Sequence, residues 1–164
     1  MCGALSSVPV YLQTLEKLKS ELPAGILRTV KKYEDVGEFK NPRYLNATRV
    51  WYRKHIHRSR APEISYSTEG ERGFVYQTMW GPNEVAPCIG ALRYWDVRDR
   101  LQEINVPCLV MDGRYDNVVP AIGKSICKSI KDAKFEFFKN SGHLPMWDER
   151  EKFTKSVGRF ITNV

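Results

Sequence analysis

Apolar residues recur at a helical step through the first half of the chain. Residues 8–36 repeat apolar side chains every three or four positions, and Pro23 interrupts the repeat near its middle, so this stretch predicts two helices. Residues 43–58 present a further apolar face and predict a third helix. Residues 62–79 predict a weaker fourth helix, which glycines interrupt. The front portion of the chain is therefore predicted to be all-helical.

The pattern changes after residue 95. The predicted elements are a short helix, a strand, a helix, a second strand and a closing amphipathic helix, over residues 96–104, 106–116, 120–130, 134–140 and 148–164. The uninterrupted apolar run from Cys108 to Met111 is typical of a parallel strand buried on both faces. Strands that alternate with helices in this way indicate an α/β sheet.

The predicted strand at 106–116 is expected to need a neighbour on each side. Only residues 134–140 offer one, so the other edge is predicted to be exposed. An exposed edge of an apolar strand is an aggregation hazard, and we therefore expect the isolated chain to be marginally stable.

The composition indicates a globular protein. The 164 residues are 42% hydrophobic and 27% charged, which excludes a disordered chain. No apolar run has the length of a membrane span, and the first residues lack the pattern of a signal peptide, so no membrane association and a cytoplasmic location are expected. The four cysteines form no Cys-x-x-Cys pair, so neither a metal site nor a disulfide framework is expected.

The positive charge is concentrated in the first third of the chain. The formal net charge is +7, and residues 1–60 contain 12 lysines and arginines against 5 acidic residues. In residues 41–60 these basic residues are interleaved with Tyr44, Trp51 and Tyr52, a mixture that some nucleic-acid-binding or other non-catalytic interaction proteins use. The alternative, which we favour, is that Tyr44 and Trp51, which lie at helical spacing, pack inward and leave a solvated basic face.

Two loops after the predicted strands carry the candidate chemistry. "DGRYDNVVP" contains Asp116, and "NSGHLPMW" contains His143. The carboxyl ends of parallel strands gather at one edge of a sheet, so the two side chains are expected to meet there. A carboxylate beside an imidazole is the acid–base pair of serine hydrolases, and the order Asp then His fits the α/β-hydrolases. Taken separately, a loop histidine such as His143 is more often a surface or hydrogen-bonded residue than a catalyst, and Asp116 is also explained as a cap of the helix that starts near Pro120.

Three stretches resemble a known family. "GPNE", "WDVRDRLQEINVPCLVMDGRYDNVVP" and "SGHLPMWDEREKF" are similar to the C-terminal part of proline iminopeptidases, which are serine aminopeptidases of the α/β-hydrolase fold. "GALSSVPVYLQTLEKLKSELPAGI" resembles the start of that family's helical cap. The resemblance implies an incomplete α/β-hydrolase fold. Residues 1–8 would end a core strand and lead into the cap, residues 9–95 would form the helical cap, and residues 96–164 would form the C-terminal part of the core.

The resemblance also implies roles for three residues. Asp116 matches the acid of the catalytic triad, His143 matches its base, and Glu84 of "GPNE" matches the carboxylate that holds the free amino group of the substrate. A carboxylate that faces an ammonium group supplies charge-assisted hydrogen bonds. The implied activity is release of an N-terminal residue, preferably proline, from a small peptide, or cleavage of an amino-acid amide or ester, without metal or cofactor.

The sequence departs from the family in two respects. Asn117 stands where these peptidases often carry a second glutamate, and an amide brings no negative charge, so amidase or esterase activity stays open. The family's Gly-x-Ser-x-Gly and His-Gly-Gly-Pro segments do not occur in the 164 residues. We therefore expect no nucleophile in this chain and no activity from it alone. The alternatives are a fragment, which we favour, a subunit completed by a separate N-terminal half, and a non-catalytic cap protein.

Overall fold

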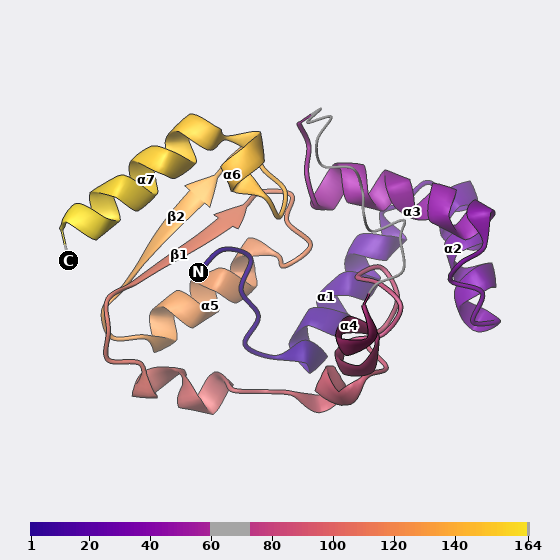
Figure 1. Cartoon of the computed structure of the whole chain (residues 1–164), viewed down its shortest axis with the longest axis horizontal. Helices are drawn as coiled ribbons and strands as arrows, with labels where there is room; N and C mark the ends of the chain where they lie inside the picture. Colours follow the sequence, from indigo (N-terminus) through magenta and orange to yellow (C-terminus); the bar gives the residue numbers. More distant parts are fainter. Residues whose placement is uncertain (60–72, 164) are drawn as a thin grey trace. The chain divides into compact units, whose positions relative to one another are not determined.

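A computed structural model describes residues 1–59 and 73–163 of the chain (Figure 1). The chain divides into two compact units. The sheet unit contains Met1–Ser7, Lys54–Ser59 and the residues from Asp96 onward. The helical unit contains Val8–Arg53 and the described residues up to Trp95. Each unit is described by itself below.

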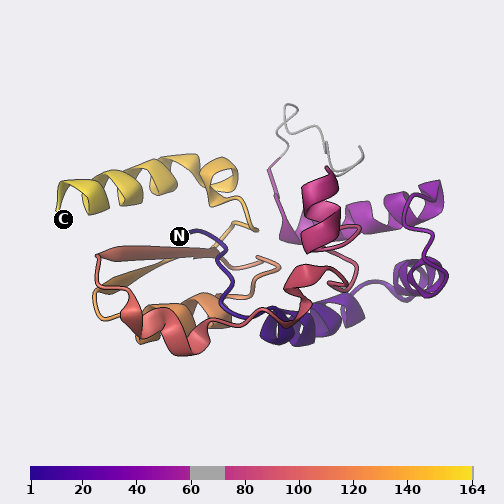
Figure 2. The same cartoon turned by 60° about the horizontal axis from the view of Figure 1, so that its bottom comes forward.

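The sheet unit is built on two parallel strands, β1 (Cys108–Gly113) and β2 (Ala133–Phe138), with Val110 paired to Phe135. Helix α5 (Pro120–Ser129) connects the strands and packs on one face of the sheet, and α7 (Arg150–Thr162) lies on the opposite face (Figure 2). A single helical turn, α6 (Pro145–Asp148), precedes α7, and a 3-10 helix, η3 (Arg98–Glu103), precedes β1. The predicted order of elements is confirmed, with the first short helix in the 3-10 form.

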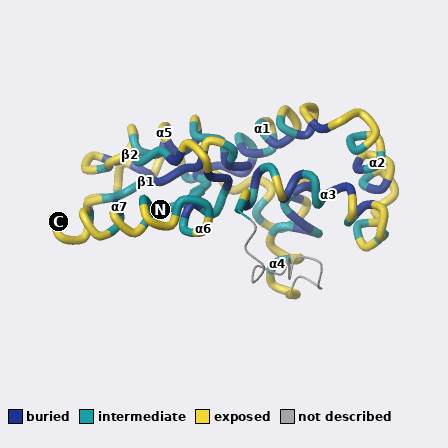
Figure 3. The backbone as a smooth tube through the Cα atoms, turned by 90° about the horizontal axis from the view of Figure 1, so that it is seen from above, coloured by how far each residue is buried: buried dark blue, intermediate teal, exposed yellow. Residues whose placement is uncertain are grey.

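Strand β1 forms the buried centre of this unit (Figure 3). Its first two residues are half-buried and its last four are buried, so burial increases along the strand toward its carboxyl end. Phe138 closes the core at the end of β2, where its ring lies 6.3 Å from the ring of Phe153 on α7. A sheet sandwiched between two helices is the arrangement that a strand apolar on both faces requires.

Among the described residues the sheet has two strands, so β1 has one neighbouring strand, as expected, but its other edge is partly covered. The N–H of Met111 donates a 2.8 Å hydrogen bond to the carbonyl of Met1, and the N–H of Gly3 donates a 3.1 Å bond to the carbonyl of Met111. Cys2 and Met111 therefore form a parallel bridge on the edge of β1 that faces away from β2. The first three residues thus pair with β1 through backbone groups. The pattern of apolar positions does not reveal such a pairing, because it does not involve side chains.

The helical unit contains α1 (Val8–Ser20), α2 (Ala24–Asp35), α4 (Phe74–Met79), the 3-10 helix η2 (Ala91–Tyr94) and all but the last two residues of α3 (Pro42–His55). The first three predicted helices are confirmed, although the third ends at His55 rather than at residue 58. Of the fourth, predicted over residues 62–79, the part at 74–79 is helical and residues 62–72 lie outside the described residues.

The aromatic residues of the basic segment 41–60 belong to the core of the helical unit. Tyr44 and Trp51 are 0% exposed and Tyr52 is 6% exposed. Their faces are therefore not available for stacking on bases, and the expected inward packing of Tyr44 and Trp51 is confirmed. A buried ion pair between Lys19 and Glu34, 2.6 Å apart, lies in the same core, where the hydroxyl of Tyr44 contacts Glu34.

The helices are short and carry many charges. The longest, α3, has 14 residues and contains four lysines and arginines as well as a histidine. Within residues 1–59 and 73–163, none of the helices combines the length and the apolar content that crossing a bilayer requires.

Candidate active site

The loops that follow β1 and β2 bring Asp116 and His143 into contact. Nδ1 of His143 lies 3.0 Å from Oδ1 of Asp116. The side chain of Asp116 is completely buried, whereas that of His143 is 33% exposed. The expected meeting of these two side chains at the carboxyl ends of the strands is thus found. Its geometry is that of a carboxylate that orients an imidazole from the protein side while the ring stays accessible to solvent.

The backbone of the first loop fixes Asp116. A tight turn follows Gly113, whose carbonyl accepts a hydrogen bond from the N–H of Asp116 at 3.1 Å. Oδ1 of Asp116 in turn accepts a hydrogen bond from the N–H of Val118 at 2.8 Å. Burial raises the pKa of Asp116, and the hydrogen bonds from His143 and from the Val118 N–H lower it. In this buried position the carboxylate form depends on those two donors, because a desolvated charge needs compensation.

The backbone of the second loop is held by the last residue of α3 and the residue that follows it. The N–H of His143 donates to the carbonyl of His55 at 2.9 Å, and the N–H of Leu144 donates to the carbonyl of Ile56 at 3.0 Å. Gly3, at φ +54°, lies against the ring itself, since a Cβ at this position would overlap His143. Sequence reasoning missed both supports, because neither lies near His143 in the chain.

A second buried carboxyl, Asp112, lies at the end of β1. It is 0% exposed, and no side chain of the described residues donates a hydrogen bond to it. Burial, together with the nearby charge of Asp116, raises the pKa of Asp112 to about 7. This residue was also missed by sequence reasoning, although an aspartate that ends an otherwise apolar strand is itself a signal of an unusual environment.

Glu84 lies in the helical unit. Its Oε2 accepts a hydrogen bond from the hydroxyl of Tyr52 at 2.6 Å, and its backbone carbonyl accepts one from the hydroxyl of Tyr11 at 3.2 Å. The turn around it is fixed by Asn83, whose Oδ1 accepts the N–H groups of Val85 and Ala86, each at 2.9 Å. Glu84 is half-buried, so the helical unit holds its carboxylate in a defined orientation.

The described residues near the pair do not include an activated nucleophile. Cys2, whose Sγ lies 4.0 Å from the carbonyl of His143, has its pKa raised to about 12 by burial and therefore remains a thiol. The hydroxyl of Ser141 is engaged by Glu149 at 2.7 Å, and Ser125 is an exposed residue of α5. None of these three side chains is therefore an activated nucleophile for the pair.

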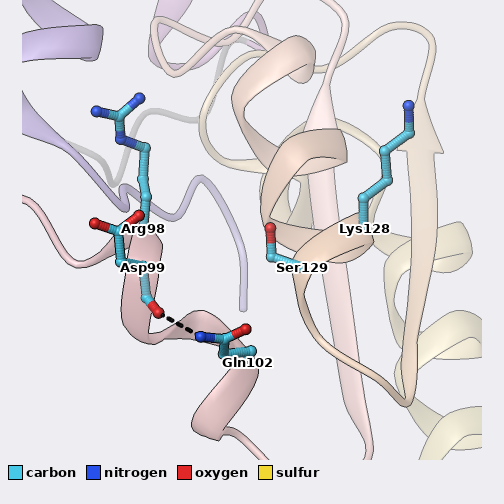
Figure 4. Close-up of a pocket in the computed structure, with 5 residues that line it drawn as sticks. All are labelled: Arg98, Asp99, Gln102, Lys128 and Ser129. Atoms are coloured by element: carbon cyan, nitrogen blue, oxygen red, sulfur yellow. Dashed lines mark hydrogen bonds between the residues drawn. The ribbon is translucent and has the colours of Figure 1, made fainter.

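A separate hollow lies between η3 and α5, away from this pair (Figure 4). It is lined by polar residues, Arg98, Asp99, Gln102, Lys128 and Ser129. The Arg98 guanidinium is held by Asp96 at 2.8 Å, and the Gln102 side chain donates to the carbonyl of Asp99 at 3.1 Å. In residues 1–59 and 73–163, no group of three or more His, Cys, Asp and Glu side chains is arranged to hold a metal ion.

Comparison with known proteins identifies relatives over nearly the whole chain, although no family model matches. A proline iminopeptidase of Saccharolobus solfataricus is 38% identical over 99% of this chain and 53% of its own length, and one of Thermoplasma volcanium is 36% identical over 97% and 55%. Among solved structures, VinJ superimposes with a TM-score of 0.87 at 31% identity, covering 99% of this chain and 56% of VinJ. A proline iminopeptidase of Mycobacterium smegmatis gives 0.82 at 28%, covering 99% and 55%. The chain therefore spans about half the length of the relatives that it matches.

Proposed function

Because the chain is related to the C-terminal part of proline iminopeptidases and carries part of an α/β-hydrolase fold, we propose that it supplies the acid and the base of the triad of an aminopeptidase-like hydrolase. The observation that carries this proposal is the 3.0 Å contact between Asp116 and His143 at the carboxyl ends of two parallel strands. Its substrate would be a small peptide, or an amino-acid amide or ester.

In this proposal His143 is the general base and then the general acid. Its neutral ring carries a proton on Nδ1, which it donates to Asp116, so Nε2 carries the lone pair that would remove the proton of a serine hydroxyl. The imidazolium that forms is stabilised by the buried charge of Asp116. The same proton is then delivered to the leaving amine, which restores the neutral ring.

Glu84 is proposed to hold the free amino group of the substrate. The hydroxyl of Tyr52 fixes one carboxylate oxygen at 2.6 Å, and the other oxygen is proposed to receive a proton of the substrate ammonium. Asn117, next to the triad acid, accepts hydrogen bonds without adding a negative charge. The grip on an α-amine is therefore proposed to be weaker than with a second carboxylate, which favours amides and esters beside peptides.

The nucleophile and the oxyanion-hole donors are proposed to come from residues that this sequence does not contain. The matching relatives are about twice as long, and the 164 residues hold no Gly-x-Ser-x-Gly segment. Acyl transfer cannot begin without the nucleophile, and the missing oxyanion donors alone account for roughly 3–4 kcal/mol of transition-state stabilisation. We therefore expect the chain by itself to be inactive.

A chimera tests this proposal. The portion of the Saccharolobus solfataricus relative that precedes the matched region is joined to residues 1–164, and hydrolysis of proline-naphthylamide is measured. We expect activity in the chimera, none in the chain alone, and a loss of about 10⁴-fold in kcat when Asp116→Asn is introduced. Asp132→Asn, a substitution of an exposed aspartate, is the matched control. A folded chimera whose activity does not depend on Asp116 or His143 contradicts the proposal.

A further inference from the structure

A single carboxylate bridges the turn before His143 and the segment that follows α3. Oδ2 of Asp148 accepts a hydrogen bond from the N–H of Gly142 at 2.9 Å. Oδ1 accepts the N–H groups of Arg58 and Ser59 at 2.8 and 2.7 Å. Hydrogen bonds to an ionised acceptor are stronger than those between neutral groups, and all three donors here belong to the backbone. Asp148 therefore ties together two stretches of chain about 90 residues apart.

The two stretches are already in close contact where the carboxylate joins them. A Cβ on Gly142 would lie 2.6 Å from the carbonyl oxygen of His55, so only glycine allows the turn to approach this closely. The next two residues, His143 and Leu144, donate their N–H groups to this segment at 2.9 and 3.0 Å. The backbone of His143 is thus held by its own N–H bond to His55 and, through the preceding Gly142, by the Asp148 carboxylate.

The carboxylate is itself anchored to the same loop. Asp148 is the last residue of α6, and its N–H donates to the carbonyl of Leu144 at 3.0 Å. The following residue, Glu149, accepts the N–H of Asn140 at 2.8 Å and the hydroxyl of Ser141 at 2.7 Å. Two consecutive acidic residues therefore bind the N–H groups of the turn that ends at His143, and only Asp148 extends these bonds to residues 58 and 59.

We propose that Asp148 is a positioning residue for His143: its carboxylate fixes the turn so that the imidazole stays aligned with Asp116. The proposal rests on the proposed role of His143 as the base. When the carboxylate is removed, the N–H groups of Gly142, Arg58 and Ser59 lose their acceptor, and the turn is free to shift relative to the buried Asp116. An asparagine accepts through one atom only, so Asp148→Asn can keep one side of the bridge but not both.

The test is an NMR measurement on residues 1–164 with ¹⁵N-labelled histidine. The Nδ1–H resonance of His143 and the pH titration of its ring are compared between the wild type, Asp148→Asn and Asp148→Ala. We expect the resonance to broaden or vanish in Asp148→Ala, with a titration midpoint at lower pH because the ring has lost its alignment with a carboxylate. Asp148→Asn gives an intermediate result. Glu151→Gln removes an exposed charge in the first turn of α7 and leaves both readouts unchanged.

An unchanged Nδ1–H resonance and titration in a folded Asp148→Ala variant would overturn the proposal. If Asp148→Ala does not fold, the bridge is tested instead by measuring amide hydrogen exchange in the wild type. The N–H groups of Gly142, Arg58 and Ser59 are expected to exchange roughly tenfold to a hundredfold more slowly than exposed amides. Rapid exchange at all three, with protection retained at His143, overturns the bridge. These readouts do not require hydrolysis, so they are independent of whether the chimera is active.

Discussion

Asp112 and Gly123 occupy adjoining space, and a Cβ on Gly123 would overlap the Asp112 carboxylate. Gly123 lies inside α5, where glycine is otherwise unfavourable by about 1 kcal/mol relative to alanine. Its lack of a side chain is what allows the helix to approach the end of β1. This close approach explains why a glycine stands in the middle of α5, which the helical pattern of the sequence does not explain.

Gly123→Ala is therefore expected to destabilise the chain. The new methyl group forces either the buried carboxyl or the helix to move, which costs about 1–3 kcal/mol in the free energy of unfolding. Chemical denaturation measures the change. Gly158→Ala in α7, where the added Cβ meets nothing within 4 Å, is the control and is expected to stabilise. If Gly123→Ala were equally stabilising, the close packing against Asp112 would be refuted.

The pH dependence of stability follows from Asp112. Its pKa is about 7 in the folded chain against an ordinary value of 3.8, so the folded chain holds one more proton than the unfolded chain between these values. The free energy of unfolding is therefore expected to fall as pH rises from roughly 4 to 7, by up to about 1.4 kcal/mol per pH unit, and to level off above pH 7. The raised pKa of Asp116 acts in the same direction.

Asp112→Asn removes this titration, so its stability curve is expected to be flatter over the same pH range. Asp132→Asn, at an exposed site, is expected to keep the slope of the wild type. The readout is the slope, because the new amide changes the absolute stability as well. Identical slopes for wild type and Asp112→Asn would show that this carboxyl does not carry the dependence.

The Tyr52–Glu84 hydrogen bond predicts a specific kinetic defect in the chimera. Tyr52→Phe removes the donor that orients Oε2 of Glu84, so KM for substrates with a free amine is expected to rise about three- to tenfold, with a smaller change in kcat. Tyr11→Phe, which removes a bond to the backbone carbonyl of Glu84 rather than to its carboxylate, is the matched control. An equal rise in KM for ester substrates without an amine would argue against amine recognition by Glu84.

The buried pair of Lys19 and Glu34 predicts a large effect on stability. Their side chains are 2% and 11% exposed, so Lys19→Met leaves a desolvated carboxylate without its partner. The expected loss is roughly 3–5 kcal/mol in the free energy of unfolding, and Lys19→Met combined with Glu34→Gln is expected to recover much of it. Arg100→Met, at an exposed pair with Glu103, is expected to change stability little. Equal effects at the two sites would contradict a buried role for Lys19.

The local pattern of the sequence predicts the elements and the meeting of Asp116 with His143. The apolar run at 108–111 identifies a buried parallel strand, and the two loops after the strands follow from its direction. These inferences succeed because they depend on neighbours in sequence and on the general geometry of parallel sheets.

The supports of the site are not predictable in this way. The pairing of Cys2 with Met111 joins backbone groups that are distant in the chain, and the Asp148 carboxylate binds the backbone N–H groups of residues 58 and 59, which are equally distant. Every residue type supplies a backbone C=O and every type except proline supplies a backbone N–H, so such contacts leave no mark in the pattern of apolar and polar positions.

Labelling with a fluorophosphonate serine probe tests the central claim most directly, since the probe reacts with a serine that an adjacent histidine activates. We predict that the chimera is labelled on a serine of its N-terminal portion, that His143→Gln abolishes this labelling, and that residues 1–164 alone are not labelled. Labelling of a serine within residues 1–164, or undiminished labelling of a folded His143→Gln chimera, would contradict the account.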